Sequence, residues 1–173
     1  ALAGLVLVTG DAGSVAAEAV RRLRGVGTAA CLVSRDDLAD DGRLSTRIAV
    51  LREVHGPVRG VLHLAGLGAD PEPGSLAAWR AATALGAKGL FALLQQCAAE
   101  IADSGWALRI VAATAMGGNW GRAPDACRAA GIGAAAAGGA HGILQSLERE
   151  HPQVIVKTID LPVEALAAQA AAW

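Results

Sequence analysis

The sequence contains no tyrosine, and its 173 residues include only one phenylalanine, one methionine and three cysteines. Without tyrosine, this chain has no phenol group that could give or take a proton during catalysis. Cys31, Cys97 and Cys127 are odd in number and stand among apolar residues, which is typical of a reduced protein rather than one held by disulfide bonds. We therefore expect a cytoplasmic protein.

Other missing features argue against several classes of partner. No apolar run is long enough to cross a bilayer, and no signal-peptide pattern precedes the first predicted strand. The formal net charge of −1 disfavours a surface built for nucleic acid. The four histidines do not pair with one another or with cysteine at a ligand spacing, so we expect no metal site. We predict neither a membrane nor a nucleic-acid partner.

The composition that is present fits a single α/β domain. Apolar residues make up 53% of the chain, which indicates a heavily buried sheet flanked by alanine-rich helices. A length of 173 residues is enough for one domain with a complete core. We interpret residues 1–173 as one domain cut from a longer polypeptide, because the first strand begins within a few residues of the start.

The segment from Gly4 to Arg35 has the pattern of a strand, a glycine turn, a helix and a second strand. An apolar run over residues 5–8 stops at Thr9 and Gly10, helical spacing follows Ser14, and residues 29–33 are apolar again. This order is the first half of a nucleotide-binding unit. It predicts a Rossmann-like, doubly wound parallel sheet in the α/β class.

The turn in this segment has two of the three glycines expected for a dinucleotide. Gly10 and Gly13 lack a Cβ atom, so a pyrophosphate could approach the backbone amides and the positive end of the following helix. Val15 or Ala16 stands where the third glycine is expected. The alternative is a strand, turn and helix whose pocket is empty or vestigial. The predicted cofactor-binding residues here are Thr9, Gly10, Gly13 and Ser14.

Ser34 and Arg35 end the second predicted strand, where NAD-binding proteins usually place a carboxylate. A guanidinium at this position suits a ribose 2′-phosphate. The sequence therefore predicts NADPH as the cofactor, although Asp36 and Asp37 follow at once and would repel the same phosphate.

The remaining strands are expected at residues 60–66, 108–114 and 154–161, with helices near residues 48–55, 76–101 and 140–150. Ile48, Leu51 and Val54 are in helical phase, and Gly86 is expected to break the long helix. A full dinucleotide fold needs another strand and helix between Arg35 and Ile48, where there is no room for both. We predict a truncated sheet whose third strand is missing, unless residues are absent from the chain over 35–48 or 120–139.

The order of these features resembles the ketoreductase domain of type I polyketide synthases, in the short-chain dehydrogenase/reductase superfamily. Within that group it is most similar to divergent ketoreductases of enediyne and polyunsaturated-fatty-acid synthases, and the resemblance covers nearly the whole chain. The matching features are Thr9-Gly10 with Gly13, Ser34-Arg35, residues 60–66, Lys88-Gly89, Thr114, Gly117-Gly118 and residues 148–161.

The resemblance implies NADPH-dependent reduction of a β-ketoacyl group to a β-hydroxyacyl group. The substrate would be carried on the phosphopantetheine of an acyl carrier protein, and neighbouring synthase domains would be partners. Ala65 and Gly66 would line the cofactor site, and Trp120 would stand at the mouth of the substrate cleft or close a tight turn.

The same resemblance assigns catalytic positions. Lys88 matches the lysine of the family and Thr114 matches its serine, but its tyrosine has no counterpart. Counting forward from Thr114 reaches Cys127, and counting backward from the last helix reaches Ala137, with His141 at the amide position of the family. We predict His141 as the substitute proton donor, because imidazole titrates near neutral pH.

Two interpretations follow from the missing tyrosine. A general acid or base contributes about 10² to 10⁴ in rate, so the domain is either a ketoreductase with a substituted donor or a non-catalytic structural domain of a megasynthase. His63 is expected to be structural in both cases.

Overall fold

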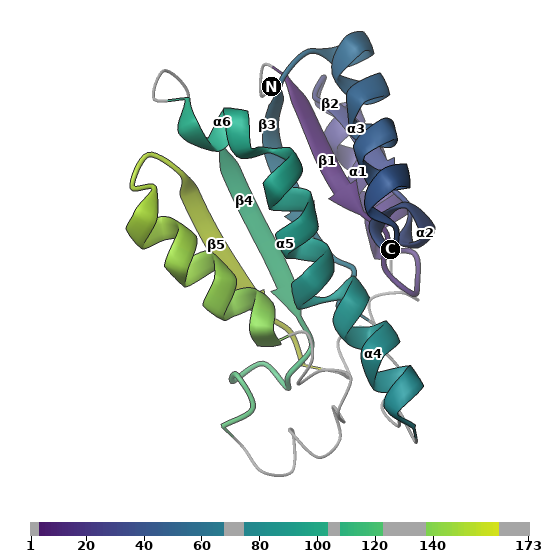
Figure 1. Cartoon of the computed structure of the whole chain (residues 1–173), viewed down its shortest axis with the longest axis vertical. Coiled ribbons are helices and arrows are strands. Elements are labelled where there is room, and N and C mark those ends of the chain that lie inside the picture. Colours follow the sequence, from purple (N-terminus) through teal and green to yellow (C-terminus); the bar gives the residue numbers. More distant parts are fainter. Residues whose placement is uncertain (1–3, 68–74, 104–107, 123–137, 163–173) are drawn as a thin grey trace.

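The computed structural model describes residues 4–67, 75–103, 108–122 and 138–162 (Figure 1). The strands are β1 (Leu5–Thr9), β2 (Ala29–Val33), β3 (Val58–His63), β4 (Arg109–Thr114) and β5 (Ile155–Asp160). The helices are α1 (Val15–Gly25), α2 (Arg35–Leu38), α3 (Asp41–His55), α4 (Leu76–Leu85), α5 (Ala87–Gln96) and α6 (Ala98–Ala102), and a further helix covers residues 138–150 before β5.

The five strands form one parallel sheet in the order β2-β1-β3-β4-β5. This confirms the predicted Rossmann-like fold and its truncation. Where a longer fold has a third strand, the described chain turns into α2 and α3 and returns directly to β3 beside β1. The strand predicted over residues 60–66 is β3, which begins two residues earlier, at Val58, and ends at His63, so Ala65 and Gly66 lie in a turn.

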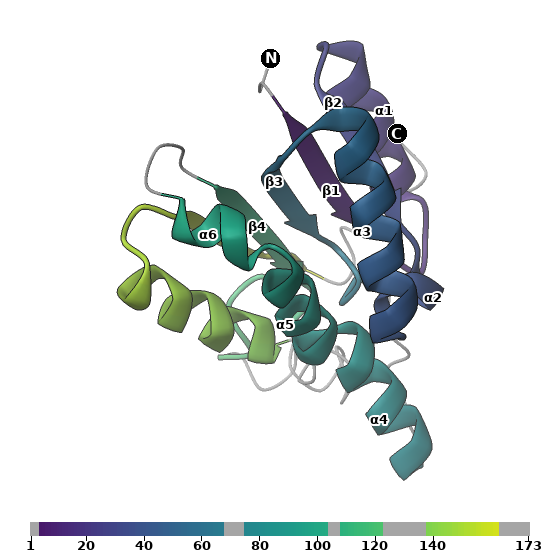
Figure 2. The same cartoon turned by 45° about the horizontal axis from the view of Figure 1, so that its top comes forward.

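Helices cover the sheet on both faces (Figure 2). One face carries α2, α3, α5, α6 and the 138–150 helix, while α1 packs on the other face against β1 and β2. Side chains along β1 point alternately to the two faces of the sheet. Leu5 and Leu7 belong to the core on the first face, and Val6 and Val8 to the core on the second. All five residues of β1 are buried, as expected for a central parallel strand.

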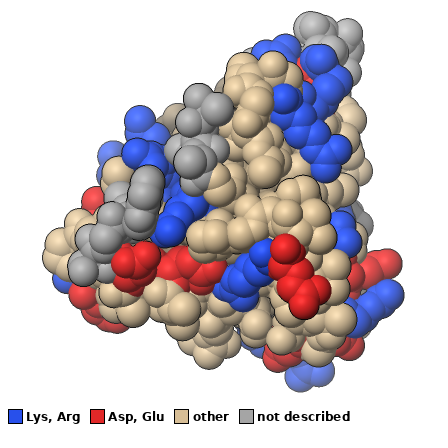
Figure 3. All heavy atoms as spheres, turned by 90° about the horizontal axis from the view of Figure 1, so that it is seen from above, with Lys and Arg blue, Asp and Glu red and all other residues tan. Residues whose placement is uncertain are grey.

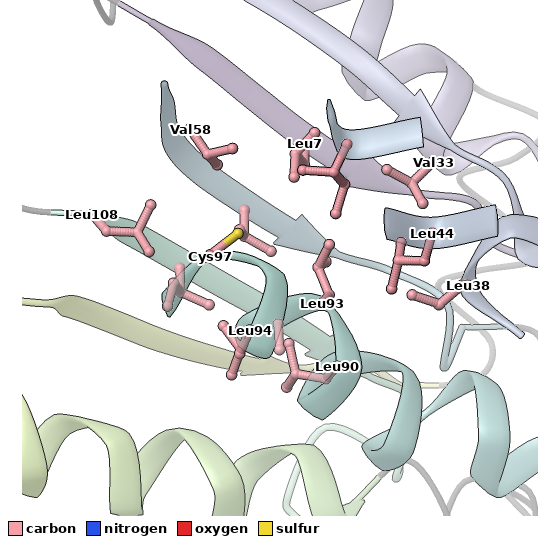
Figure 4. Close-up of a cluster of buried hydrophobic side chains, with 14 of the residues drawn as sticks. Leu7, Val33, Leu38, Leu44, Val58, Leu90, Leu93, Leu94, Cys97 and Leu108 are labelled. Atoms are coloured by element: carbon pink, nitrogen blue, oxygen red, sulfur yellow. The ribbon is translucent and has the colours of Figure 1, made fainter. Parts of the chain in front are cut away.

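The larger core lies between the sheet and α2, α3 and α5 (Figure 4). Burying one such leucine stabilises the fold by about 1.5–3 kcal/mol, and α3 and α5 supply several. Ile48 and Leu51 are buried as predicted, but Val54 is 69% exposed and lies outside the core. The long helix is broken at Gly86 as predicted and again at Cys97.

Candidate functional site

The carboxyl ends of all five strands lie at one edge of the sheet (Figure 1), where open α/β sheets bind their ligands. The predicted site residues gather at this edge because each follows or ends a strand. Thr9 ends β1, Ser34 follows β2, Ala65 follows β3 and Thr114 ends β4.

The turn after β1 is organised by Asp11. Asp11 Oδ2 accepts hydrogen bonds from the amides of Gly13 and Val15, at 3.0 and 3.2 Å, and Oδ1 accepts one from Ala16 at 3.0 Å. Ser14, the residue that precedes α1, makes no hydrogen bond with its side chain to the start of the helix. The carboxylate of Asp11 therefore caps α1 in its place.

Two further amides of the same turn also have acceptors within the protein. The amide of Gly10 donates to the Val33 carbonyl at 2.8 Å, and that of Ala12 donates to the Leu67 carbonyl at 3.3 Å. The first bond joins the turn to the end of β2 and the second joins it to the turn after β3. The turn is thus tied to the sheet on both sides.

Thr9 belongs to a buried network beneath the turn. His63 Nε2 lies 3.1 Å from the carbonyl oxygen of Gly86, which can only accept, so Nε2 carries the proton. Burial lowers the pKa of His63 to about 4, so the ring is neutral at pH 7 and Nδ1 accepts the Thr9 hydroxyl at 3.3 Å. Thr9 Oγ1 in turn accepts the amides of Leu64 and Ala65, at 2.8 and 3.1 Å. The hydroxyl of Thr9 is fully used by the protein.

Ser34 and Arg35 have different surroundings at the end of β2. The Ser34 hydroxyl accepts the Asp37 amide at 3.0 Å and donates to the Asp37 carboxylate at 2.7 Å, which caps α2. Arg35 is half-buried, and its Cγ lies 3.8 Å from where a Cβ on Gly10 would stand. Within the described ranges Arg35 makes no ion pair, and its side chain begins beside the turn.

Thr114, at the end of β4, is bound to the last strand. Its hydroxyl donates to Asp160 Oδ1 at 2.8 Å, and the same carboxylate accepts the amides of Met116 and Trp120, at 2.7 and 2.8 Å. Trp120 has a φ of 61°, in the left-handed region that non-glycine residues rarely adopt. Asp160 therefore holds both the catalytic candidate and the loop that follows it.

His141 lies next to this loop. Its ring centroid is 4.6 Å from that of Trp120, and its Nδ1 is 2.9 Å from the hydroxyl of Thr158 on β5. The structure thus connects Thr114 to His141 through Asp160 and Trp120. Cys127 and Ala137, the two positions reached by counting to the family tyrosine, lie outside the described residues.

Lys88 is exposed on the first turn of α5. In the part of the chain that the structure describes, no hydrogen bond or ion pair joins Lys88 to Thr114 or His141. Of the three predicted catalytic residues, the structure therefore connects Thr114 and His141 but not Lys88.

The structure adds three polar residues that the sequence analysis did not select. They are Asp11, Thr158 and Asp160. A signal for Asp11 was present, because aspartate readily accepts amides two residues further along the chain at a turn. Asp160 could have been noted as a carboxylate at the end of a parallel strand, but its partners are 40 to 46 residues away in the sequence.

Replacing Asp160 with alanine should loosen the loop without unfolding the sheet. The amides of Met116 and Trp120 would lose a charged acceptor, so their hydrogen exchange should accelerate about 10- to 100-fold. Exchange at these two amides can be followed by NMR, with Asp36→Ala, at an exposed position, as the control. Equal exchange rates in the two variants would contradict this role of Asp160.

Charged and metal-binding side chains could also mark a site among the described residues. On the face seen in Figure 3, basic and acidic side chains are interspersed with large uncharged areas. Among the described residues there is no group of three or more histidine, cysteine, aspartate or glutamate side chains placed to hold a metal ion. No helix in the same ranges is both long and apolar enough to cross a membrane.

Comparisons of sequence find no relatives, since no family model matches this chain and no curated protein matches it significantly. Comparisons of structure find many similar proteins. A 3-ketoacyl-(acyl-carrier-protein) reductase from Brucella melitensis, solved with NADH, has a TM-score of 0.72 at 15% identity, over 89% of this chain and 73% of the reductase. A variant of the actinorhodin polyketide ketoreductase, solved with NADPH, has a TM-score of 0.69 at 20% identity, over 90% and 69% of the two chains.

A metagenomic short-chain oxidoreductase in complex with NADP has a TM-score of 0.65 at 21% identity, over 96% of this chain and 76% of that enzyme. These likenesses show that the chain has the fold of short-chain oxidoreductases. A fold of this kind binds the pyrophosphate of a dinucleotide at the amides that begin the first helix. Here those amides are bound to Asp11, so the residues present do not fit a pyrophosphate, although Arg35 would suit a 2′-phosphate.

Proposed function

We propose that this chain is a ketoreductase-type domain of a type I polyketide synthase that serves a structural rather than a catalytic role. The proposal rests on the fold of short-chain oxidoreductases, shared with two reductases of ketoacyl or polyketide substrates, and on the order of motifs in the sequence. The observation that carries the non-catalytic part is the hydrogen bond from the Thr114 hydroxyl to Asp160 in a chain without tyrosine.

Reduction of a ketone needs a proton for its oxygen and a donor that holds this oxygen in place. A threonine hydroxyl has one proton, and that of Thr114 is donated to a carboxylate at 2.8 Å. Hydrogen bonds to ionised acceptors are about twice as strong as those between neutral groups. Donation to a neutral ketone would therefore replace a stronger bond with a weaker one. Lys88 is exposed, and no hydrogen bond joins it to Thr114 among the described residues.

The packing of the domain supports a structural role. The five strands pair without a gap in one parallel sheet with helices on both faces, and the side chains of Leu5, Leu7 and Leu93 are fully buried. A well-packed core, together with a site that lacks the tyrosine of the family, is expected of a domain whose role is structural. Its partners would be neighbouring domains of a cytoplasmic synthase and the acyl carrier protein.

A second candidate is the reduction itself, with NADPH as the cofactor and a β-ketoacyl group on the acyl carrier protein as the substrate. It is favoured by the position of His141, whose ring is held by Trp120 and Thr158 near the ends of β4 and β5. Nε2 of this ring is the nitrogen that would deliver the proton. Arg35, beside the turn after β1, would favour NADPH over NADH.

The two candidates are separated by assaying the synthase that contains the domain. For the structural role, we expect the reduction state of the product to be unchanged in Thr114→Val and His141→Gln, whereas Leu93→Asp, which disrupts the core, should abolish product formation. The isolated chain should not oxidise NADPH with a β-ketoacyl thioester. NADPH oxidation that His141→Gln abolishes and His151→Gln leaves intact would contradict the structural role and establish the second candidate.

A further inference from the structure

We propose that Asp11 is a built-in substitute for the phosphate of a dinucleotide: its carboxylate occupies the anion site at the start of α1 and closes that site to the cofactor. The inference does not depend on the proposed structural role. It concerns only which anion the backbone amides of this turn hold.

The carboxylate of Asp11 makes the contacts that a bound phosphate would make. Both of its oxygens accept amides, two at Oδ2 and one at Oδ1, across the turn and the first residues of α1. These are groups that a helix cannot satisfy by itself. They also lie at the positive end of the helix dipole, which stabilises a negative charge. The Asp11 carboxylate thus supplies the anion that these amides would otherwise bind from solution.

The glycine at position 13 has an explanation in this arrangement. A Cβ on Gly13 would lie 3.1 Å from Asp11 Oδ2, closer than ordinary packing allows. A Cβ on Gly10 would lie 3.6 Å from its nearest neighbour, the Val33 carbonyl oxygen, which is ordinary van der Waals contact. Within this structure, therefore, the tight contact at position 13 is with the carboxylate of Asp11, and a side chain there would press on it.

A pyrophosphate would bind poorly whether or not Asp11 moved. If the carboxylate stayed in place, like charges about 4 Å apart near a protein surface would weaken binding on the order of a thousandfold. If it swung away, three charge-assisted hydrogen bonds would be lost and merely replaced by those to the phosphate. The Ala12 amide offers no alternative contact, because it is bound to Leu67.

The test compares three variants with the unmodified chain, using NADPH and inorganic pyrophosphate as probes. Asp11→Gly removes the carboxylate. Asp11→Asn removes the charge but keeps a side chain able to cap α1. Asp40→Gly is the matched control, because it removes an aspartate that caps α3 through a hydrogen bond to the Arg43 amide at 2.9 Å. Binding is measured by calorimetry and by the rise in melting temperature, at equal ionic strength.

We expect the unmodified chain and Asp40→Gly to show no saturable binding of either probe at millimolar concentration. Asp11→Asn and Asp11→Gly should bind both at least tenfold more tightly than that limit. Should Asp11→Gly fail to fold, the capped variant Asp11→Asn still gives the answer. The proposal is overturned if the unmodified chain binds NADPH as tightly as the Asp11 variants, or if folded Asp11 variants bind neither probe. Turnover is not measured, so the result is independent of the proposed structural role.

Discussion

Replacing Glu100 with alanine should lower the free energy of unfolding by about 2–3 kcal/mol, because it removes a charged acceptor from the Arg52 guanidinium and from the Val58 amide. Glu100 is only 7% exposed, and its two carboxylate oxygens are each 2.8 Å from a guanidinium nitrogen of Arg52. It also accepts the amide of Val58 at 3.2 Å, and Arg52 donates to the carbonyl of Gln96 at 2.6 Å. The pair therefore joins α3, α5, α6 and the start of β3.

The protonation of Glu100 supports this expectation. Burial alone would raise its pKa, but the hydrogen bonds from Arg52 and from the Val58 amide outweigh burial and hold the pKa below its usual value. Glu100 is consequently charged at pH 7, and removing it leaves the Arg52 guanidinium, whose side chain is 30% exposed, without its counter-ion.

Urea unfolding measures this effect, and Glu18→Ala is a suitable control. Glu18 also pairs with arginines, Arg21 and Arg22, but their side chains are 68% and 56% exposed, so its loss should change stability little. The double variant Arg52→Met, Glu100→Met should recover much of the loss, because no charge remains unpaired. Equal effects of Glu100→Ala and Glu18→Ala would refute the importance of the buried pair.

Lowering the pH from 7 to 5 should remove about 2 kcal/mol of stability through His63 alone. In the folded protein burial lowers its pKa to about 4, against an ordinary value of 6.5. The unfolded chain therefore binds a proton that the folded chain excludes, and stability falls as the pH drops below about 6.5 until it levels off near 4. The carboxyl of Glu100, with its lowered pKa, costs stability only at lower pH.

The pH dependence can be assigned by substitution. His63→Gln keeps a donor toward the Gly86 carbonyl but does not titrate, so unfolding curves between pH 7 and pH 5 should become nearly superimposable in this variant. His55→Gln, on the exposed side of α3, should retain the slope of the unmodified chain. A slope that survives in His63→Gln would show that another group is responsible.

The fold was predictable because its signals are local. The apolar run of β1, the glycine turn and the helical spacing after Ser14 lie within 35 residues and fix a strand, a helix and a parallel neighbour. The truncation of the sheet was also predictable. The segment from Arg35 to Ile48 is too short to hold the additional strand and helix of a full dinucleotide fold. Val54 was misplaced because helical phase alone does not tell where the sheet beneath a helix ends.

The site was less predictable because its chemistry is made by contacts between distant segments. The sequence predicted that Thr114 ends a strand, but its contact with Asp160 depends on the pairing of β4 with β5. Gly10 and Gly13 predicted that a pyrophosphate could approach the backbone amides of the turn. Only the structure shows that the carboxylate between them, that of Asp11, reaches forward to the same amides.

The hydroxyl of Thr9 has a consequence for the interpretation of mutagenesis. It links the carboxyl ends of β1 and β3, because it accepts hydrogen bonds from two backbone amides and donates one to the ring of His63. Thr9→Val would therefore loosen the attachment of the segment after β3 to the end of β1. A lower melting temperature in that variant would report the loss of these structural hydrogen bonds, not the loss of a ligand contact. The same reasoning applies to Ala65, whose amide donates to the same oxygen.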